Sequence, residues 1–218
     1  MSARLFAGNI SLIMVLDPEV AMAEVVLFHS ALGLRPGVAA AADRLREAGH
    51  TVHTPDYYDG EVFEDLDDGL RKRDELGYAE IARRAKEAVA ELPAGLVFAG
   101  FSLGVVPAEL LAAGRPGALG AVLMHAAVPV EGFSEFGVER WPAGVPAQVH
   151  YAAEDPWVEV PEVTSLRDAV RQAGARFEAH TYPGSGHLFT DPDLPEYDSS
   201  SSNLMWRRVL EFLSRTDA

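Results

Sequence analysis

The sequence predicts one α/β domain built on a mostly parallel β-sheet with helices on both faces. From residue 23 onward, short runs rich in valine, leucine and phenylalanine alternate with longer segments of helical periodicity, which is typical of repeated βα units. The runs are nearly continuous in apolar character, as expected for strands that helices cover on both sides. The predicted strands are residues 24–29, 51–55, 95–100, 119–125, 147–151 and 177–182.

Apolar residues between these strands recur every three to four positions, which indicates amphipathic helices. Glycine or proline directly follows the segments that end at residues 48, 92 and 173, and both residue types end helices. The last segment follows a run of four serines, whose hydroxyl groups can cap its first turn. The predicted helices cover residues 37–48, 74–92, 105–113 and 163–173, and a final one follows residues 199–202.

The composition excludes several classes of function. The 33 acidic and 18 basic residues give a formal charge of −15, and such a surface repels the phosphate backbone of nucleic acids. The chain has no cysteine, which rules out disulfide bonds, a thiolate zinc site and a cysteine nucleophile. We therefore expect no nucleic-acid partner, and any covalent catalysis must use another atom.

The first 22 residues differ from the rest of the chain. Residues 6–16 are apolar, but Asn9 interrupts them and only Arg4 could supply the basic start of a signal peptide. We expect residues 1–22 to be an N-terminal extension or an edge strand, and residues 23–218 to be the single domain. No segment reaches the roughly 20 apolar residues that span a bilayer, so we expect a soluble cytoplasmic protein without membrane association, as a monomer or homodimer.

The motif with the most chemical content is Gly100-Phe101-Ser102-Leu103-Gly104. It lies directly between a predicted strand and a predicted helix, which is where a G-x-S-x-G sequence forms a nucleophile elbow. The strained turn of such an elbow lifts the serine above the end of the sheet, and small flanking residues let the strand and helix backbones approach. Ser102 is therefore the candidate nucleophile, with a surface serine in a glycine-bounded turn as the alternative.

A serine hydroxyl is a weak nucleophile unless a base takes its proton and a third group orients that base. In the α/β-hydrolase fold the acid and then the histidine follow the serine along the chain. Asp155 comes just after the fifth predicted strand, and His187 comes after the sixth in a glycine-rich loop. Because functional loops gather at the carboxyl edge of a parallel sheet, the pattern predicts an α/β-hydrolase fold with Ser102, His187 and Asp155 as catalytic residues. Glu154 is the alternative acid.

Two backbone N–H groups are predicted to form an oxyanion hole. Leu103 begins the helix after the nucleophile, where N–H groups lack partners within the helix, and Ala31 follows the first core strand. Only about twenty residues separate the fourth and fifth predicted strands, too few for a large cap domain, so we expect an open cleft. Its predicted wall residues, each with structural packing as the alternative, are Tyr57, His125, Trp157 and Phe189.

Carboxylates are dense between Asp56 and Asp68. Their spacing does not follow a calcium-binding loop, and dense carboxylates usually form a solvated surface. We expect no metal ion and no cofactor.

Taken together, these residues resemble the dienelactone hydrolase family of small α/β-hydrolases. The resemblance covers about residues 23–214 and rests on Pro55-Asp56-Tyr57-Tyr58, on the serine elbow and on the Gly-His loop at His187. It implies that Asp155 and His187 are the acid and the base of the family. Members commonly have cysteine in the elbow, so this chain would be a serine-nucleophile member.

Two further positions depart from the family pattern. Ser30, a further candidate cleft residue, stands where many members have a glutamate that engages the nucleophile. Asp191 stands where they have an arginine that holds the substrate carboxylate. We therefore expect neutral esters or lactones to be better substrates than carboxylate-bearing dienelactones, unless Arg35 restores anion binding.

The leading functional hypothesis is hydrolysis of a small carboxylic ester or lactone through an acyl-enzyme intermediate. Among enzymes, a lactonase close to true dienelactone hydrolase is the nearest alternative. A non-catalytic binding or regulatory protein on the same scaffold is the alternative from another class, because a fold does not fix a function.

Overall fold

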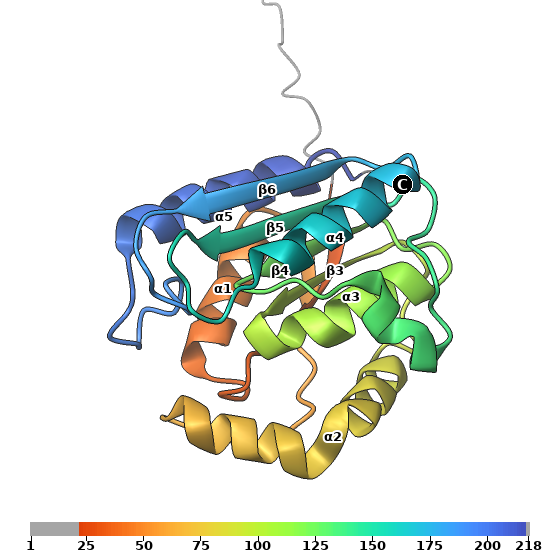
Figure 1. Cartoon of the computed structure of the whole chain (residues 1–218). Helices are drawn as coiled ribbons and strands as arrows, with labels where there is room; N and C mark the ends of the chain where they lie inside the picture. The colour runs from red at the N-terminus through yellow and green to blue at the C-terminus, as the bar shows by residue number, and fades with distance from the viewer. Residues whose placement is uncertain (1–21, 217–218) are drawn as a thin grey trace, which may run out of the picture.

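The computed structural model describes residues 22–216 and has a six-stranded sheet flanked by helices (Figure 1). Its strand order is β2-β1-β3-β4-β5-β6, and every neighbouring pair is parallel. The strands are β1 (Glu24–Phe28), β2 (Thr51–His53), β3 (Leu96–Phe101), β4 (Gly120–Met124), β5 (Ala147–Ala152) and β6 (Phe177–Tyr182). The predicted fold class is thus confirmed, while the extension or edge strand predicted for residues 1–22 lies, apart from Met22, outside the described residues.

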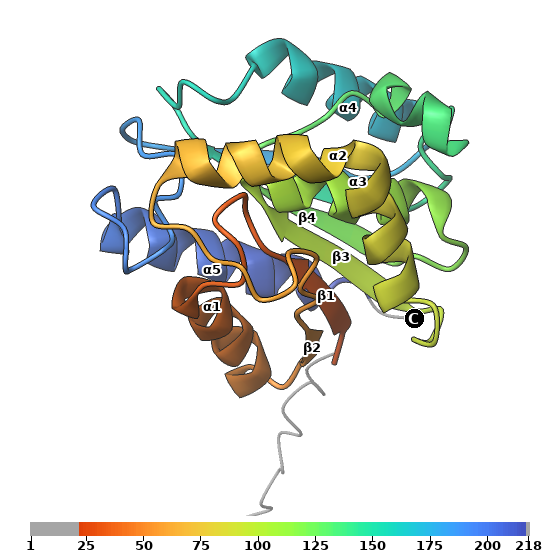
Figure 2. The same cartoon turned by 90° about the horizontal axis from the view of Figure 1, so that it is seen from below.

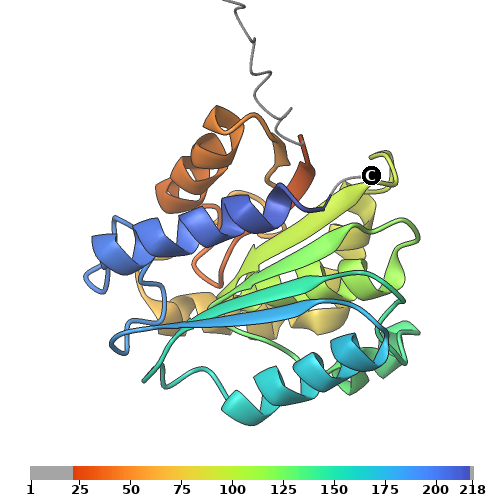
Figure 3. The same ribbon diagram turned by 90° about the horizontal axis from the view of Figure 1, so that it is seen from above.

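Each face of the sheet has its own hydrophobic core. Successive strand residues point to opposite faces, so Val26 and Phe28 of β1 join one core while Val25 and Leu27 join the other. The first core is covered by α2 (Leu66–Ala88), α3 (Val105–Gly114) and α4 (Val160–Gln172), and the second by α1 (Pro36–Glu47) and α5 (Ser199–Leu213) (Figures 1 and 3). We refer to them as the α3-side core and the α5-side core.

Helix α2 begins at Leu66, eight residues before the predicted start at residue 74. The reason is a cap, because the Asp65 carboxylate accepts hydrogen bonds from the backbone N–H groups of Asp67 and Asp68. Part of the acidic stretch read as a solvated surface therefore starts a helix. Gly77, with φ 76° and ψ 155°, interrupts α2, and the helix lies next to α3 (Figure 2).

Helix α5 corrects the prediction that the serine run forms a cap. Ser199 to Ser202 make up the first turn of the helix, and the capping residue is Asp198. Its carboxylate accepts a hydrogen bond from the Ser201 N–H at 2.6 Å, and this bond lowers the pKa of Asp198. Among the described residues, no helix is both long enough and apolar enough to cross a membrane.

Candidate active site

Ser102 lies in a tight turn between β3 and α3. A short 3₁₀ helix, η1 (Ser102–Gly104), joins them, and Ser102 has φ 49°, a left-handed conformation that non-glycine residues rarely adopt. A Cβ atom at Gly100 would lie 2.1 Å from the Gly104 oxygen, and one at Gly104 would lie 2.5 Å from the His29 oxygen. Both glycines are therefore needed for the turn to close, and Ser102 lies at the carboxyl edge of the sheet.

Ser102, His187 and Asp155 form a continuous chain of hydrogen bonds. The His187 Nε2 atom lies 2.7 Å from the Ser102 Oγ atom, and its Nδ1 atom lies 2.8 Å from Asp155 Oδ2. Both His187 and Asp155 are buried. Because a carboxylate only accepts hydrogen bonds, Nδ1 carries the proton, which leaves Nε2 free to accept one from the serine hydroxyl.

The Asp155 carboxylate is fixed by a second bond, and its loop is tied to the loop of His187. Asp155 Oδ1 accepts a hydrogen bond from the Trp157 N–H at 2.9 Å. The neighbouring Glu154 N–H donates to the Gly184 carbonyl at 3.0 Å, which joins the segment after β5 to the segment after β6. The Glu154 side chain is exposed, so the alternative acid does not take part in the hydrogen-bonded chain.

Ala31 and Leu103 line the same pocket as Ser102 and His187, which places both oxyanion-hole candidates beside the nucleophile. Helix α2 packs directly against Ala31, since a Cβ atom at Gly69 would lie 2.2 Å from the Ala31 oxygen. Gly69 was not among the predicted site residues. A glycine inside a helical segment can mark a packing constraint, but the helix was predicted to begin only at residue 74, so Gly69 lay outside it.

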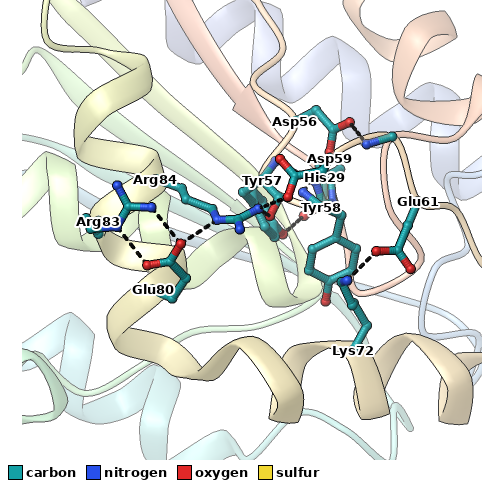
Figure 4. Close-up of polar contacts among 11 residues, drawn as sticks. His29, Asp56, Tyr57, Tyr58, Asp59, Glu61, Lys72, Glu80, Arg83 and Arg84 are labelled. Atoms are coloured by element: carbon teal, nitrogen blue, oxygen red, sulfur yellow. Dashed lines mark hydrogen bonds and ion pairs between the residues drawn. The ribbon is translucent and has the colours of Figure 1, made fainter.

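The segment that carries Ala31 also packs against the loop after β2. The Tyr57 hydroxyl donates to the His29 carbonyl at 2.5 Å, and the two rings stack with centroids 3.7 Å apart. A hydrogen bond from His29 is the main cause that lowers the pKa of Asp56 to about 2. Asp56 is therefore the anionic partner of a buried histidine (Figure 4).

Arginine and lysine residues fasten this loop to α2 (Figure 4). Arg84 donates to the Tyr57 carbonyl at 3.1 Å and forms ion pairs with Asp59 and Glu80. Lys72 of α2 forms an ion pair with Glu61 of the same loop. Some carboxylates of the acidic stretch between Asp56 and Asp68 therefore connect the loop after β2 to α2. The composition of the stretch alone did not indicate this role.

A cavity of about 380 Å³ opens beside Ser102. Trp157 lines it, as predicted, but the other four predicted cleft residues do not. Tyr57, His125 and Phe189 are buried in packing contacts, and Ser30 is buried with its hydroxyl oxygen accepting a hydrogen bond from the Leu32 N–H at 3.2 Å. These four expectations are corrected, and for the three aromatic rings the alternative of structural packing holds.

His125 is a support of the site and not part of its wall. Its Nε2 atom lies 2.9 Å from Thr190 Oγ1, and its ring meets the rings of His187 and Phe189 edge to face. Burial is the main cause that lowers the pKa of His125 well below its ordinary value, so the ring stays neutral. His125 thus packs against the loop that carries His187 without adding charge to it.

The remaining walls come from residues that were not among the predicted cleft residues. The short helix η2 (Val130–Phe136) supplies Phe133 and Phe136, α3 supplies Val106, and α2 supplies Leu70 and Tyr78. The helix η2 lies within residues 125–146, which join β4 to β5, and no large cap domain is present among the described residues.

Asp191 and Arg35 do not line the pocket. The Arg35 guanidinium is buried, donates to the Phe63 carbonyl at 2.9 Å and lies near two carboxylates, those of Glu64 and Asp191. Asp191 therefore faces a cation outside the pocket. Arg35 is therefore not placed to bind a substrate anion, because its charge is already balanced by Glu64 and Asp191 outside the pocket.

Behind the pocket wall, α3 buries a carboxyl group. Glu109 is fully buried, one of its oxygens accepts a hydrogen bond from the Val128 N–H at 3.1 Å, and the other has no partner among the described residues. Burial raises the pKa of Glu109 well above its ordinary value. The folded protein therefore holds a proton on Glu109 that the unfolded chain loses above its ordinary pKa of about 4.5.

This proton makes the stability of the protein depend on pH. Between these two pKa values the unfolded chain binds fewer protons than the folded protein. The free energy of unfolding therefore falls as the pH rises from about 4.5 towards the folded-state pKa of Glu109. The substitution Glu109→Gln keeps the shape and cannot ionise, so at pH 8 it is expected to stabilise the protein by at least about 1 kcal/mol relative to its effect at pH 5. Urea unfolding at both pH values measures this, with the exposed Glu91→Gln as control. A Glu109→Gln effect that is the same at both pH values would contradict the prediction.

Comparisons with known proteins agree with this architecture. A family profile described as the dienelactone hydrolase family matches residues 13–216. A relative from Escherichia coli (strain K12), provisionally named a carboxymethylenebutenolidase, is 32% identical over 65 residues, which cover 30% of this chain and 24% of the relative. A relative from Salmonella typhi with the same name gives the same values. The chain thus matches about a quarter of the length of these relatives.

Two solved structures share most of the fold. A dienelactone hydrolase-like promiscuous phosphotriesterase from metagenomic libraries is 21% identical, with a TM-score of 0.73 over 92% of this chain and 89% of that one. A protein from Klebsiella pneumoniae, provisionally named a dienelactone hydrolase, is 20% identical, with a TM-score of 0.70 over 91% of this chain and 89% of that one. The protein has the α/β-hydrolase fold. Since the family profile spans nearly the whole chain, the protein belongs to the dienelactone hydrolase family.

Proposed function

We propose that the protein is a serine hydrolase that cleaves carboxylic esters or lactones through an acyl-enzyme intermediate. The observation that carries the proposal is the hydrogen-bonded chain from Asp155 through His187 to Ser102, which ends on a serine in a strained turn. A serine whose proton can pass to an oriented histidine is the arrangement that nucleophilic catalysis requires.

In the first half of the reaction, Ser102 Oγ attacks the carbonyl carbon while its proton moves to His187 Nε2. The carbonyl oxygen becomes an oxyanion, and the N–H groups of Leu103 and Ala31 stabilise it. The carbon–oxygen bond to the leaving group then breaks, and the leaving oxygen takes the proton from His187. Asp155 remains ionised throughout and stabilises the transient imidazolium.

The second half repeats these steps with water. His187 takes a proton from a water molecule, and the resulting hydroxide attacks the acyl group on Ser102. Collapse of the second oxyanion returns the proton to Ser102 and releases the carboxylic acid. With a lactone as substrate, the leaving hydroxyl stays attached to the acyl group, so the product is a single hydroxy acid. A cytoplasmic location and a monomeric or homodimeric state remain predictions.

Covalent labelling tests the proposal directly. A fluorophosphonate is expected to modify the intact chain once, at Ser102, because the reagent needs a serine that transfers its proton to a base. The variant Ser102→Ala is expected to stay unlabelled, while Ser134→Ala, which changes an exposed serine of η2, is expected to label like the original chain. Mass spectrometry of the intact and digested protein measures this. A folded chain that takes no label would favour a non-catalytic binding or regulatory role.

A further inference from the structure

The cavity beside Ser102 is larger than a short acyl group needs. Its volume of about 380 Å³ equals that of roughly a dozen water molecules at their liquid volume of about 30 Å³ each. An acetyl group fills only a small part of such a space. Val106, Val128, Phe133 and Phe136 are among the residues that line the cavity.

The lining of the cavity is mainly apolar. It draws on several elements of the α3-side core: Leu70 comes from α2, Val106 from α3, and Phe133 and Phe136 from η2. Trp157 adds an indole ring that is about half exposed. Binding of an apolar ligand group to such walls is favourable because it removes apolar surface from water.

The charges on the lining oppose an anionic ligand. Glu135 and Glu162 line the cavity, and within residues 22–216 neither forms an ion pair. The cation on the lining, Arg73, makes an ion pair with the neighbouring Asp74, with N–O distances of 2.7 and 2.8 Å. A carboxylate on the substrate would therefore meet two uncompensated negative charges and one cation whose charge is already partly balanced.

We propose that this cavity binds the apolar arm of a neutral ester or lactone, with a chain of about six to ten carbons, and that it rejects substrates whose arm ends in a carboxylate. The inference rests on the proposed serine hydrolase function and adds the substrate class. It replaces the small substrates expected from the sequence with larger, uncharged ones. It also places the source of charge selectivity at Glu135 and Glu162 instead of Asp191.

The expected size of the effect follows from the burial of methylene groups. Each fully buried CH₂ group is worth about fourfold in kcat/KM, and a half-open cavity gives less. From an acetyl to an octanoyl ester we therefore expect a rise of at least about 30-fold. An octanoyl chain that ends in a carboxylate is expected to react at least about tenfold more slowly than the neutral chain.

The test is a kcat/KM series on the full chain. One arm of the experiment uses p-nitrophenyl esters with acyl chains of 2 to 14 carbons, and the other uses acetate esters of alcohols with 2 to 10 carbons. A rise in either arm up to about eight carbons supports the proposal and shows which side of the ester occupies the cavity. A flat or falling profile in both arms, with acetate esters still hydrolysed, would overturn it. Loss of all hydrolysis and of fluorophosphonate labelling would instead overturn the proposed function.

Three substitutions make the test specific to the cavity. Val106→Phe fills the lining and is expected to lower the ratio of octanoate to acetate turnover at least about tenfold, whereas Val106→Ala is expected to retain or raise this ratio. Val160→Phe makes the same change at an exposed position outside the lining and is expected to leave the ratio unchanged. Equal effects of the two phenylalanine variants would overturn the proposal.

Charge selectivity has its own pair of variants. Glu162→Gln and Glu135→Gln are each expected to raise the ratio of carboxylate-ended to neutral octanoate turnover at least about threefold at low salt. The increase is expected to shrink at high salt because screening already weakens the repulsion. A preference of the original chain for the carboxylate-ended substrate would overturn the proposal.

Discussion

Replacing Ser102 with alanine is expected to lower kcat for ester hydrolysis by about 10⁴- to 10⁶-fold, the range found when a serine nucleophile is removed. The only side-chain hydrogen bond of Ser102 among the described residues is the one to His187, so the fold is expected to survive. His187→Ala is expected to match this loss. Because the two groups act as one unit, the double variant is expected to be little worse than either single one.

Steady-state kinetics on a p-nitrophenyl ester, with thermal unfolding as a check on the fold, measure these losses. Ser134→Ala provides a matched control, since it also removes a hydroxyl group but at an exposed position. Near-original turnover by Ser102→Ala would refute the mechanism. Losses that multiply in the double variant would show that Ser102 and His187 act separately.

Asp155→Asn is expected to lower kcat by about 10⁴-fold, as such a change does in other triads. Asparagine can still accept the Trp157 N–H bond with its oxygen, which then turns its NH₂ group towards His187 Nδ1. That donor selects the histidine tautomer with a proton on Nε2. The ring then presents a donor to Ser102 and can no longer accept its proton.

The matched control is Glu154→Gln, the same chemical change at the exposed neighbour. We expect it to change kcat less than about threefold, since the Glu154 backbone makes the contact to Gly184 and its side chain does not. The kcat ratio of the two variants measures the assignment. The reverse ranking would move the role of the acid to Glu154.

The strands and the candidate catalytic residues could be predicted because they follow local sequence patterns. All six strands were predicted to within two residues at each end, because buried parallel strands are short, apolar and bounded by turn residues. Ser102 was predicted as the nucleophile from its flanking glycines, and in the structure a Cβ atom at Gly100 or Gly104 would clash with a neighbouring backbone oxygen. Asp155 and His187 were predicted because each follows a strand, and parallel strands bring such positions to one edge; the structure places them within hydrogen-bond distance of each other.

The pocket walls could not be predicted in the same way. Tyr57, His125 and Phe189 follow strand ends as Trp157 does, but which of these rings faces the cavity depends on partners distant in sequence. His125 packs against Thr190, 65 residues away, and Tyr57 stacks on His29. The start of α2 was missed for another reason, because its first turn is acidic and its helical character depends on the cap at Asp65.

The two separate cores have a consequence for the hydrogen bond between Ser102 and His187. Leu103, next to the serine, is anchored in the α3-side core, whereas Phe101 and Phe189 are anchored in the α5-side core. The distance between Ser102 Oγ and His187 Nε2 therefore depends on how the two cores are packed relative to each other. A displacement of about 1 Å at reacting atoms can lower the rate a hundredfold. A small packing change in either core is therefore expected to lower kcat more visibly than it lowers the free energy of unfolding.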